Sequence, residues 1–167
     1  MHVDAEIRYP ATPAQVSEML ADSEFVERKC AEMGATEHTV LVEGDAAGAF
    51  TVTSSRTMPT NDFPDVARKF VGSSVQIRQT DAWQEAGSDG GREGTITVEI
   101  VGAPLRMTGG QWLRPNGDGC LQVVDGDLKA SIPLVGGKLE KAAEPAIRMA
   151  IRKEDEVGHA WLAERAG

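Results

Sequence analysis

The segment from Lys138 to Arg165 carries the longest helical pattern in the chain. Apolar residues recur in it at spacings of three and four, which places them on one face of an α-helix. They are Leu139, Ala142 or Ala143, Ala146, Ala150, Val157 and Trp161. Pro145 predicts a local kink or a delayed start of this helix. An amphipathic helix of this length must bury its apolar face against another layer of structure.

Alternating apolar and polar residues predict that this layer is a β-sheet, because successive side chains of a strand point to opposite faces. The predicted strands are His2–Tyr9, Thr36–Val42, Phe50–Arg56, Ser74–Trp83, Arg92–Leu113 with a break near Gly102–Pro104, and Cys120–Ile132. Turn-rich stretches at 44–48, 86–91 and 115–119 separate several of these strands, which favours an antiparallel meander.

Two short helices are predicted between the first two strands. Thr12, Pro13 and Gln15 form a helix start, because the Thr12 hydroxyl can accept from a free amide and Gln15 can reach back to the cap. A second helix is predicted to begin at Asp22 or Ser23 and to end before a glycine at position 34.

The segment from Phe63 to Val71 interrupts the strand pattern. Pro59 and Pro64 indicate a loop, and the helical spacing after them predicts a short amphipathic helix or turn. Between two strands of a curved sheet, this segment could gate access to an interior cavity or could be a fixed lid over the core. Phe70 lies in it and is a candidate ligand contact.

The order of these elements predicts an α+β fold, in which a curved antiparallel sheet wraps around the long C-terminal helix. One helix covers less area than six or seven strands present, so the space between them is either filled by large side chains or left as a cavity. Aromatic residues make up 5% of the chain, which favours a cavity, although aliphatic residues could fill it. The length of 167 residues predicts a single domain spanning 1–167.

Charge and cysteine content restrict the partners and the compartment. The net charge of −9 disfavours nucleic acid and anionic membrane surfaces as partners. No run approaches the roughly 18 apolar residues of a membrane helix, so no membrane insertion is expected. Cys30 and Cys120 lack a metal-ligand spacing and are expected to stay reduced. We therefore expect a cytoplasmic protein.

The junction Ile132–Glu140 and the segment from Phe63 to Gly72, together with the order of elements, resemble the START-like helix-grip superfamily. This superfamily, also called SRPBCC, includes polyketide cyclases, lipid-transfer domains and birch-pollen-type allergens. More narrowly, the chain is similar to an uncharacterised bacterial branch of it. The resemblance covers essentially the whole chain and implies a helix-grip fold that binds lipids, sterols, polyketides or hormones, or that catalyses cyclisation or dehydration in the same cavity. It assigns no catalytic residue.

Three arginines lie in the middle of predicted strands. Arg78 and Arg106 have the outward phase of the alternation, whereas Arg56 shares the phase of the apolar residues in its strand. A guanidinium that points inward could hold a carboxylate or a phosphate through two hydrogen bonds.

Five further residues are candidates for the cavity. Gln79 and Asp81 have the inward phase and could orient a ligand in an apolar pocket. Trp83 shares this phase and could line the pocket or pack in the core. Glu154 lies near the apolar stripe of the final helix, where it could face water, bind a polar ligand group or act as a general base. Gly158 could allow a ligand to approach the helix backbone or could reflect simple tolerance.

These patterns lead to one main hypothesis and two alternatives. The main hypothesis is a non-catalytic module that binds an apolar or amphipathic small molecule, such as a lipid, a fatty acid or a polyketide-like compound. An enzyme in the same cavity, a cyclase, dehydratase or hydrolase using Glu154, Asp81 or Arg56, is the first alternative. The second is a structural or interaction domain with a filled core, which could form a homodimer through a strand edge. No cofactor, metal site or catalytic nucleophile is predicted.

Overall fold

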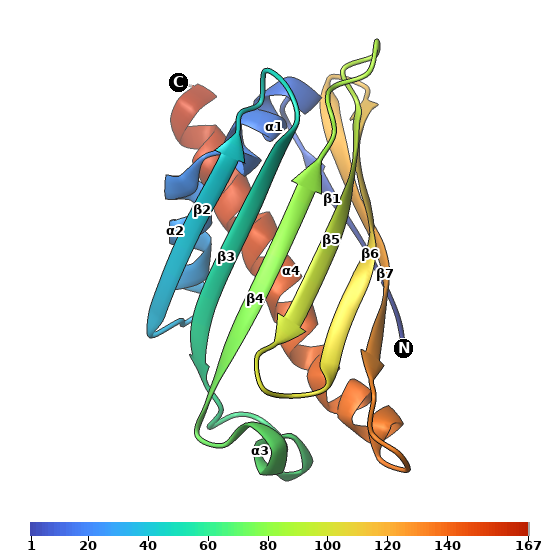
Figure 1. The fold of residues 1–167 in the computed structure, drawn as a ribbon. Helices are drawn as coiled ribbons and strands as arrows, with labels where there is room; N and C mark the ends of the chain where they lie inside the picture. Colours follow the sequence, from blue (N-terminus) through green and yellow to red (C-terminus); the bar gives the residue numbers. More distant parts are fainter. Residues whose placement is uncertain (167) are drawn as a thin grey trace.

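The computed structural model describes residues 1–166 and contains, over that range, one seven-stranded antiparallel sheet and four helices (Figure 1). In chain order the elements are β1 (His2–Tyr9), α1 (Pro13–Leu20), α2 (Ser23–Glu32), β2 (Glu37–Gly44), β3 (Phe50–Pro59), α3 (Asp65–Val71), β4 (Ser74–Trp83), β5 (Arg92–Ile100), β6 (Leu105–Asn116), β7 (Gly119–Ala130) and α4 (Gly136–Ala166). The strand order across the sheet is β1-β7-β6-β5-β4-β3-β2. Strands β2 to β7 therefore form the predicted meander, and β1 pairs with its last strand.

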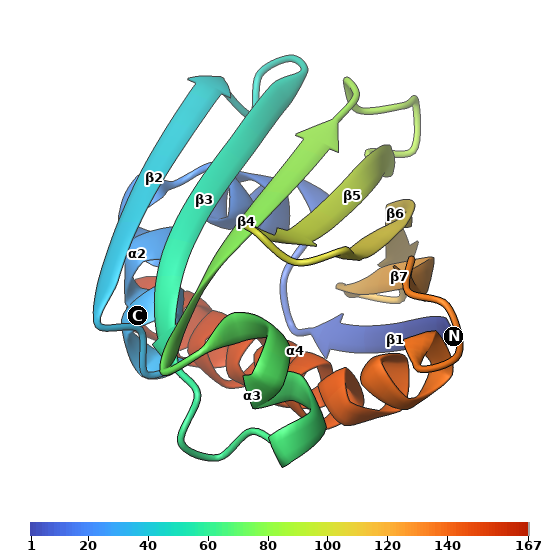
Figure 2. The same ribbon diagram turned by 60° about the horizontal axis from the view of Figure 1, so that its bottom comes forward.

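The sheet bends around α4, which crosses its concave side (Figures 1 and 2). This arrangement confirms the predicted α+β helix-grip fold, in which the twist of a large antiparallel sheet creates the concave face that receives the helix. The helix begins at Gly136, two residues before the predicted start, and continues through Pro145. The start of α4 is therefore not delayed by the proline.

Side-chain caps fix both short helices at the positions that the sequence predicts. At α1 the Thr12 hydroxyl accepts from the Gln15 amide at 3.2 Å, and the Thr12 amide donates to Gln15 Oε1 at 2.9 Å. At α2 the cap is Asp22, whose carboxylate accepts from the Glu24 amide at 2.9 Å. Each cap satisfies backbone donors that the first helical turn leaves free.

The strands extend further into the turns than predicted. Strand β3 continues to Pro59, and β6 and β7 pair as far as Asn116 and Gly119. Gly117, with a φ of 60°, occupies the first central position of the resulting two-residue turn, where a positive φ suits a tight hairpin. Conversely, β7 ends at Ala130, two residues before the predicted end.

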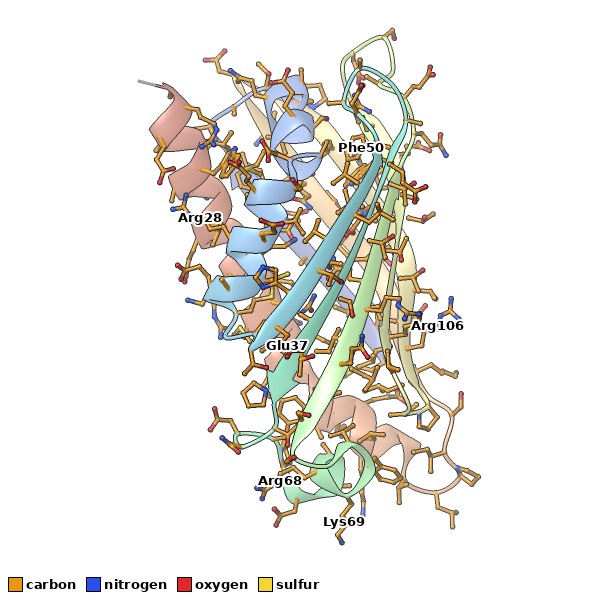
Figure 3. The ribbon with its side chains drawn as sticks, turned by 60° about the vertical axis from the view of Figure 1, so that its left-hand side comes forward. Arg28, Glu37, Phe50, Arg68, Lys69 and Arg106 are labelled. Atoms are coloured by element: carbon orange, nitrogen blue, oxygen red, sulfur yellow. The ribbon has the colours of Figure 1, made fainter. Side chains whose placement is uncertain are left out.

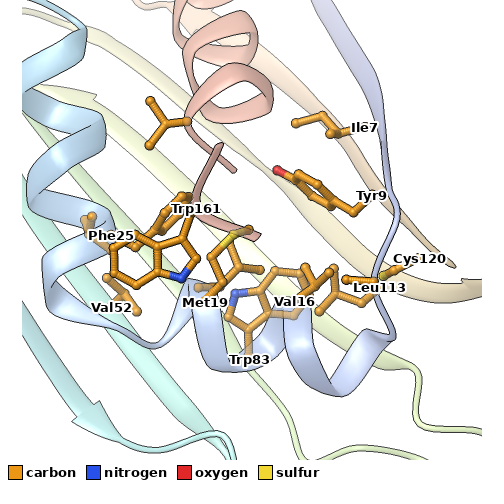
Figure 4. Packing of buried hydrophobic residues seen from close by; sticks show 14 of the residues in the cluster. Ile7, Tyr9, Val16, Met19, Phe25, Val52, Trp83, Leu113, Cys120 and Trp161 are labelled. Atoms are coloured by element: carbon orange, nitrogen blue, oxygen red, sulfur yellow. The ribbon is translucent and has the colours of Figure 1, made fainter. Parts of the chain in front are cut away.

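One end of the grip, where α1, α2 and the C-terminal half of α4 meet the sheet, is densely packed (Figure 4). Phe25 and Trp161 pack edge to face with ring centroids 5.7 Å apart. The other large buried side chains of this cluster include Tyr9, Met19, Phe50, Trp83 and Leu113. Large side chains therefore fill the space between helix and sheet at this end.

Candidate functional site

A cavity of about 170 Å³ lies between the sheet and α4. It is at the end of the grip where α3 lies between the sheet and α4 (Figure 2). Its walls come from α3, α4 and the inward faces of the strands. The sheet side is aliphatic and includes Val75, Ile77, Ile96, Val98, Ile100, Leu105, Met107, Val124 and Leu128. The prediction of an incompletely filled interior thus holds at this end of the grip.

Small residues on α4 explain why the space stays open. The cavity-facing stripe in the first part of α4 includes Ala142, Ala143, Ala146 and Ala150, whereas its last part carries Trp161. The methyl side chain of alanine is too short to reach the sheet, so a void remains beside the first half of the helix. Beside the second half, larger side chains fill the corresponding space.

Polar residues close the inner end of the cavity, between it and the densely packed aromatic end. On β4, the inward row changes from apolar Val75 and Ile77 to polar Gln79 and Asp81 before it reaches Trp83. The same level of the grip holds other buried or half-buried polar side chains. We call this set the polar band; its members are Lys29, Arg56, Gln79, Asp81, Gln111, Gln122 and Glu154.

A buried ion pair anchors the polar band to the helices. Lys29 Nζ of α2 lies 3.1 Å from Glu154 Oε2 of α4, and Gln122 donates to Glu154 Oε1 at 2.9 Å. Burial by itself raises the pKa of Glu154, but Lys29 and the Gln122 hydrogen bond outweigh it and bring that pKa below its ordinary value. Burial lowers the pKa of Lys29, but Glu154 and Asp81 outweigh it, and the pKa lies above its ordinary value.

Glutamines surround the second carboxylate of the band. Asp81 accepts from Gln79 at 2.9 Å and from Gln111 at 3.0 Å. Burial raises the pKa of Asp81, and the repulsion from Glu154 acts in the same direction, against Lys29 and the two amide donors. Asp81 therefore holds a proton more readily than an exposed aspartate.

A second, smaller cavity of about 20 Å³ lies on the other side of the polar band. Polar groups of Lys29, Ser54, Gln111 and Gln122 face it, and it is large enough for one water molecule. Gln122 Oε1 has no hydrogen-bond partner among residues 1–166.

The structure brings most of the predicted site residues together. The inner end of the main cavity is lined by Arg56, Gln79, Asp81 and Glu154. Phe70 lines the same cavity at its other end, beside α3. Arg56 is 5% exposed, which agrees with its inward phase. Arg78 and Arg106 are exposed, and Figure 3 shows Arg106 on the outer side of the sheet. Of the two positions weighed for Glu154, the inward one is observed.

Two predicted residues lie elsewhere. Gly158 is outside the cavity lining, because the ring of Tyr9 packs against the helix there, and a Cβ at 158 would lie 2.7 Å from Tyr9 Cε1. Trp83 belongs to the packed core and borders the 20 Å³ cavity, not the main one. Trp83 is therefore a packing residue, the alternative left open for it. Gly158 is neither a ligand contact nor a merely tolerated glycine, because its missing side chain makes room for the Tyr9 ring.

Sequence reasoning missed Lys29, Gln111 and Gln122, although patterns in the sequence mark all three. Lys29 follows Phe25 by four residues and so shares the inward face of α2. Gln111 and Gln122 have the inward phase of β6 and β7, and both are at most 3% exposed. Their polarity argues against an inward position, since a single polar residue in a strand is more often exposed.

The polar band can orient a ligand, because Arg56 keeps free N–H donors while the carboxylates of Asp81 and Glu154 are already hydrogen-bonded. In residues 1–166, Arg56, Asp81 and Glu154 make no direct hydrogen bond with one another; Gln79 links Arg56 to Asp81, whereas Glu154 bonds Gln122 and Lys29. General acid–base catalysis needs a group whose proton site is free to face substrate. Both carboxylates of the band instead accept hydrogen bonds from side chains of the protein itself.

The rim of the cavity lies at α3. Phe70 is 40% exposed while also lining the cavity, which places it where the interior meets solvent. Pro64 at the α3 N-cap makes no side-chain cap bond, and Ala67 is the buried residue of this helix. Figure 3 shows Arg68 and Lys69 on the outer side of α3. Apart from Ala67, Val66 and Val71, the residues of α3 are exposed to solvent.

The similarity to a known protein family extends over nearly the whole chain. Residues 4–162 match a family described as "Protein of unknown function (DUF2505)". The chain belongs to the DUF2505 family. An uncharacterized protein of Mycobacterium tuberculosis, Rv0481c, is 20% identical over 166 residues, covering 95% of both chains. None of the described helices of this DUF2505 chain is long and apolar enough to cross a membrane.

Solved structures share the helix-grip fold of this DUF2505 chain. The crystal structure of TTHA0849 from Thermus thermophilus is similar with a TM-score of 0.59 and 18% identity, covering 94% of this chain and 96% of the other. A STAR-related lipid transfer protein from Xanthomonas axonopodis is similar with a TM-score of 0.50 and 20% identity, covering 90% and 85%. These likenesses confirm the predicted fold.

Proposed function

We propose that this protein binds an apolar or amphipathic small molecule in the cavity between the sheet and α4. The observation that carries the proposal is the combination of an aliphatic wall with a polar closed end. Ligand pockets commonly combine apolar walls with a few polar groups that fix orientation. A lipid fragment, a fatty acid or a polyketide-like compound has matching chemistry.

The size of the cavity restricts the ligand. A cavity of about 170 Å³ exceeds the roughly 150 Å³ of an engineered apolar cavity that takes up benzene. It is smaller than the roughly 300 Å³ at which pockets for drug-sized ligands begin. The proposed ligand is therefore a short chain or a single ring system, unless α3 moves outward to make room.

The comparisons support the proposal through analogy of fold. One structural neighbour is named as a STAR-related lipid transfer protein, so a helix grip of this kind serves lipid transfer there.

We also propose that the DUF2505 protein is cytoplasmic, where its unbridged thiols, Cys30 and Cys120, would remain reduced.

Native mass spectrometry of protein purified from its own host tests the proposal. We expect a bound small molecule that Ala143→Phe removes, because the new ring would occupy the cavity next to α4. Ala163→Phe is the matched control, since Ala163 is exposed on the same helix. Wild-type protein without adduct, and without affinity for any added fatty acid or alcohol, would refute the proposal. Conversion of the bound molecule on incubation would identify an enzyme instead.

We also propose that the segment from Phe63 to Val71 gates the cavity. Amide hydrogen exchange is expected to be fast in α3 of the free protein and to slow when a ligand occupies the cavity. Exchange in α3 as slow as in β4, with no change on ligand addition, would show that the segment is a fixed lid.

A further inference from the structure

Arg56 is a buried cation with few hydrogen-bond partners. It projects from β3 into the inner end of the cavity and is 5% exposed. Its one hydrogen bond within residues 1–166 is a long one, 3.4 Å to Gln79 Oε1, and no carboxylate in that range lies within ion-pair distance. A guanidinium carries five N–H donors, so most of them have no acceptor here.

The other buried arginine shows what a structural role looks like in this fold. Arg92 donates to three backbone carbonyl oxygens, those of Gly48 at 2.7 Å, Gln84 at 3.0 Å and Ala46. It thereby ties the β2–β3 hairpin to β5. Arg56 makes no such bonds, although burying a charge without partners is costly.

The neighbouring carboxylates do not compensate Arg56 directly. Both oxygens of Asp81 accept from glutamine amides, and both oxygens of Glu154 are taken by Lys29 and Gln122. Burial lowers the pKa of Arg56 but leaves it a guanidinium, since this group stays protonated in proteins. The free donors of Arg56 therefore match an anion that the chain itself does not supply.

The cavity beyond Arg56 offers apolar surface. Its cross-strand partner Ile77 and the next inward residue of β3, Met58, belong to an aliphatic cluster beside the cavity. From there the walls continue through Leu105 and Leu139 toward α3. A molecule with its head at Arg56 would place its remainder among these side chains.

We infer that the ligand is a carboxylic acid with a short aliphatic chain, whose carboxylate is bound by Arg56 and whose chain fills the cavity toward α3. This inference rests on the proposed function and specifies its ligand class. A planar carboxylate matches the forked donors of a guanidinium, and the apolar surroundings strengthen the bond.

Paired probes test the inference. Isothermal titration calorimetry would compare hexanoic acid with hexan-1-ol, which share a chain length and differ in charge. The wild-type protein is expected to bind the acid at least about tenfold more tightly, as charge-assisted pairing implies. Arg56→Met should weaken acid binding by about tenfold or more while leaving alcohol binding unchanged. Arg106→Met, on the outer face, is the matched control and should change neither.

A second measurement does not depend on the variant folding. Wild-type protein with hexanoic acid carrying a carbon-13 carboxyl should show a bound resonance at the position of the ionised carboxylate, unchanged between about pH 5 and pH 8. A bound resonance at the position of the neutral acid, or equal affinities for acid and alcohol, would overturn the inference and leave the proposed function standing. Failure of both probes to bind across chain lengths from hexyl to tetradecyl would overturn both.

Discussion

At the scale of single residues, the polar band shows how this fold tolerates charge in its interior. Lys29 and Glu154 come from different helices, and Lys29 Nζ lies 3.1 Å from Glu154 Oε2. Gln122 donates a hydrogen bond to the other carboxylate oxygen, Glu154 Oε1. Such a pair contributes little net stability compared with apolar packing, but removing one partner leaves a buried charge alone.

Lys29→Met should therefore be strongly destabilising. We expect the free energy of unfolding, measured by urea denaturation, to fall by about 3–5 kcal/mol, because Glu154 loses its counter-charge. The double variant Lys29→Met, Glu154→Gln should recover much of this loss. Lys153→Met, which removes an exposed pair with Glu156, should cost no more than about 1 kcal/mol. A Lys29→Met loss as small as this control would contradict the buried-pair description.

Asp81 is expected to make stability depend on pH in the opposite sense to a salt-bridged acid. Its pKa is raised by burial, so the folded chain binds this proton more tightly than the unfolded chain. The contribution of Asp81 to stability is therefore gained as pH falls through the raised pKa. The stability of Asp81→Asn minus that of the wild type should decrease between about pH 8 and pH 4. A difference that grows on acidification would show that Asp81 is stabilised as the anion.

At the scale of elements, α4 sets what the grip can hold. The alanines in its first half are too small to fill the space between helix and sheet, so a cavity remains there. In its second half, Val157, Gly158 and Trp161 allow dense packing. Gly158 matters because the Tyr9 ring lies where a side chain would be. The same helix therefore serves as a cavity wall at one end and as a core element at the other.

Gly158→Ala should destabilise the protein, although alanine is ordinarily the better helix residue. The added Cβ would lie 2.7 Å from a ring atom of Tyr9, which is 2% exposed and has no room to move. We expect a loss of roughly 1–3 kcal/mol in thermal or urea unfolding. Gly137→Ala on the same helix meets nothing within 4 Å and should be neutral or stabilising by up to about 1 kcal/mol. Equal effects of the two substitutions would disprove the Tyr9 contact.

At the scale of the whole molecule, the grip has three zones along its length: an apolar cavity beside α3, the polar band, and the densely packed aromatic end. The same sheet and the same helix run through all three. Strands β1 and β2 form the two edges of the sheet, and a homodimer through either edge stays a prediction.

This continuity predicts that the chain unfolds as one cooperative unit, as expected for a single domain. Tryptophan fluorescence reports on Trp83 and Trp112 in the sheet and Trp161 on α4, and far-ultraviolet circular dichroism reports on the backbone. We expect the two thermal transitions to coincide. Separate midpoints would mean that the cavity end and the aromatic end unfold independently.

The sequence determined the elements and the direction of most side chains. Alternation fixes which strand residues face inward, and this pattern alone predicts that Arg56, Gln79 and Asp81 point into the grip. The Thr12 and Gln15 capping pattern likewise predicts a local structure, because its hydrogen bonds join residues three apart. Local geometry alone decides such features.

Tertiary structure decided which inward residues meet. Lys29 and Glu154 are 125 positions apart, and Tyr9 reaches α4 from the other end of the chain. No local pattern encodes these distances, because they depend on how far the sheet bends and how α4 is rotated against it. That rotation buried Glu154 beside Lys29, placed Gly158 under Tyr9 and left Arg56 facing the open space.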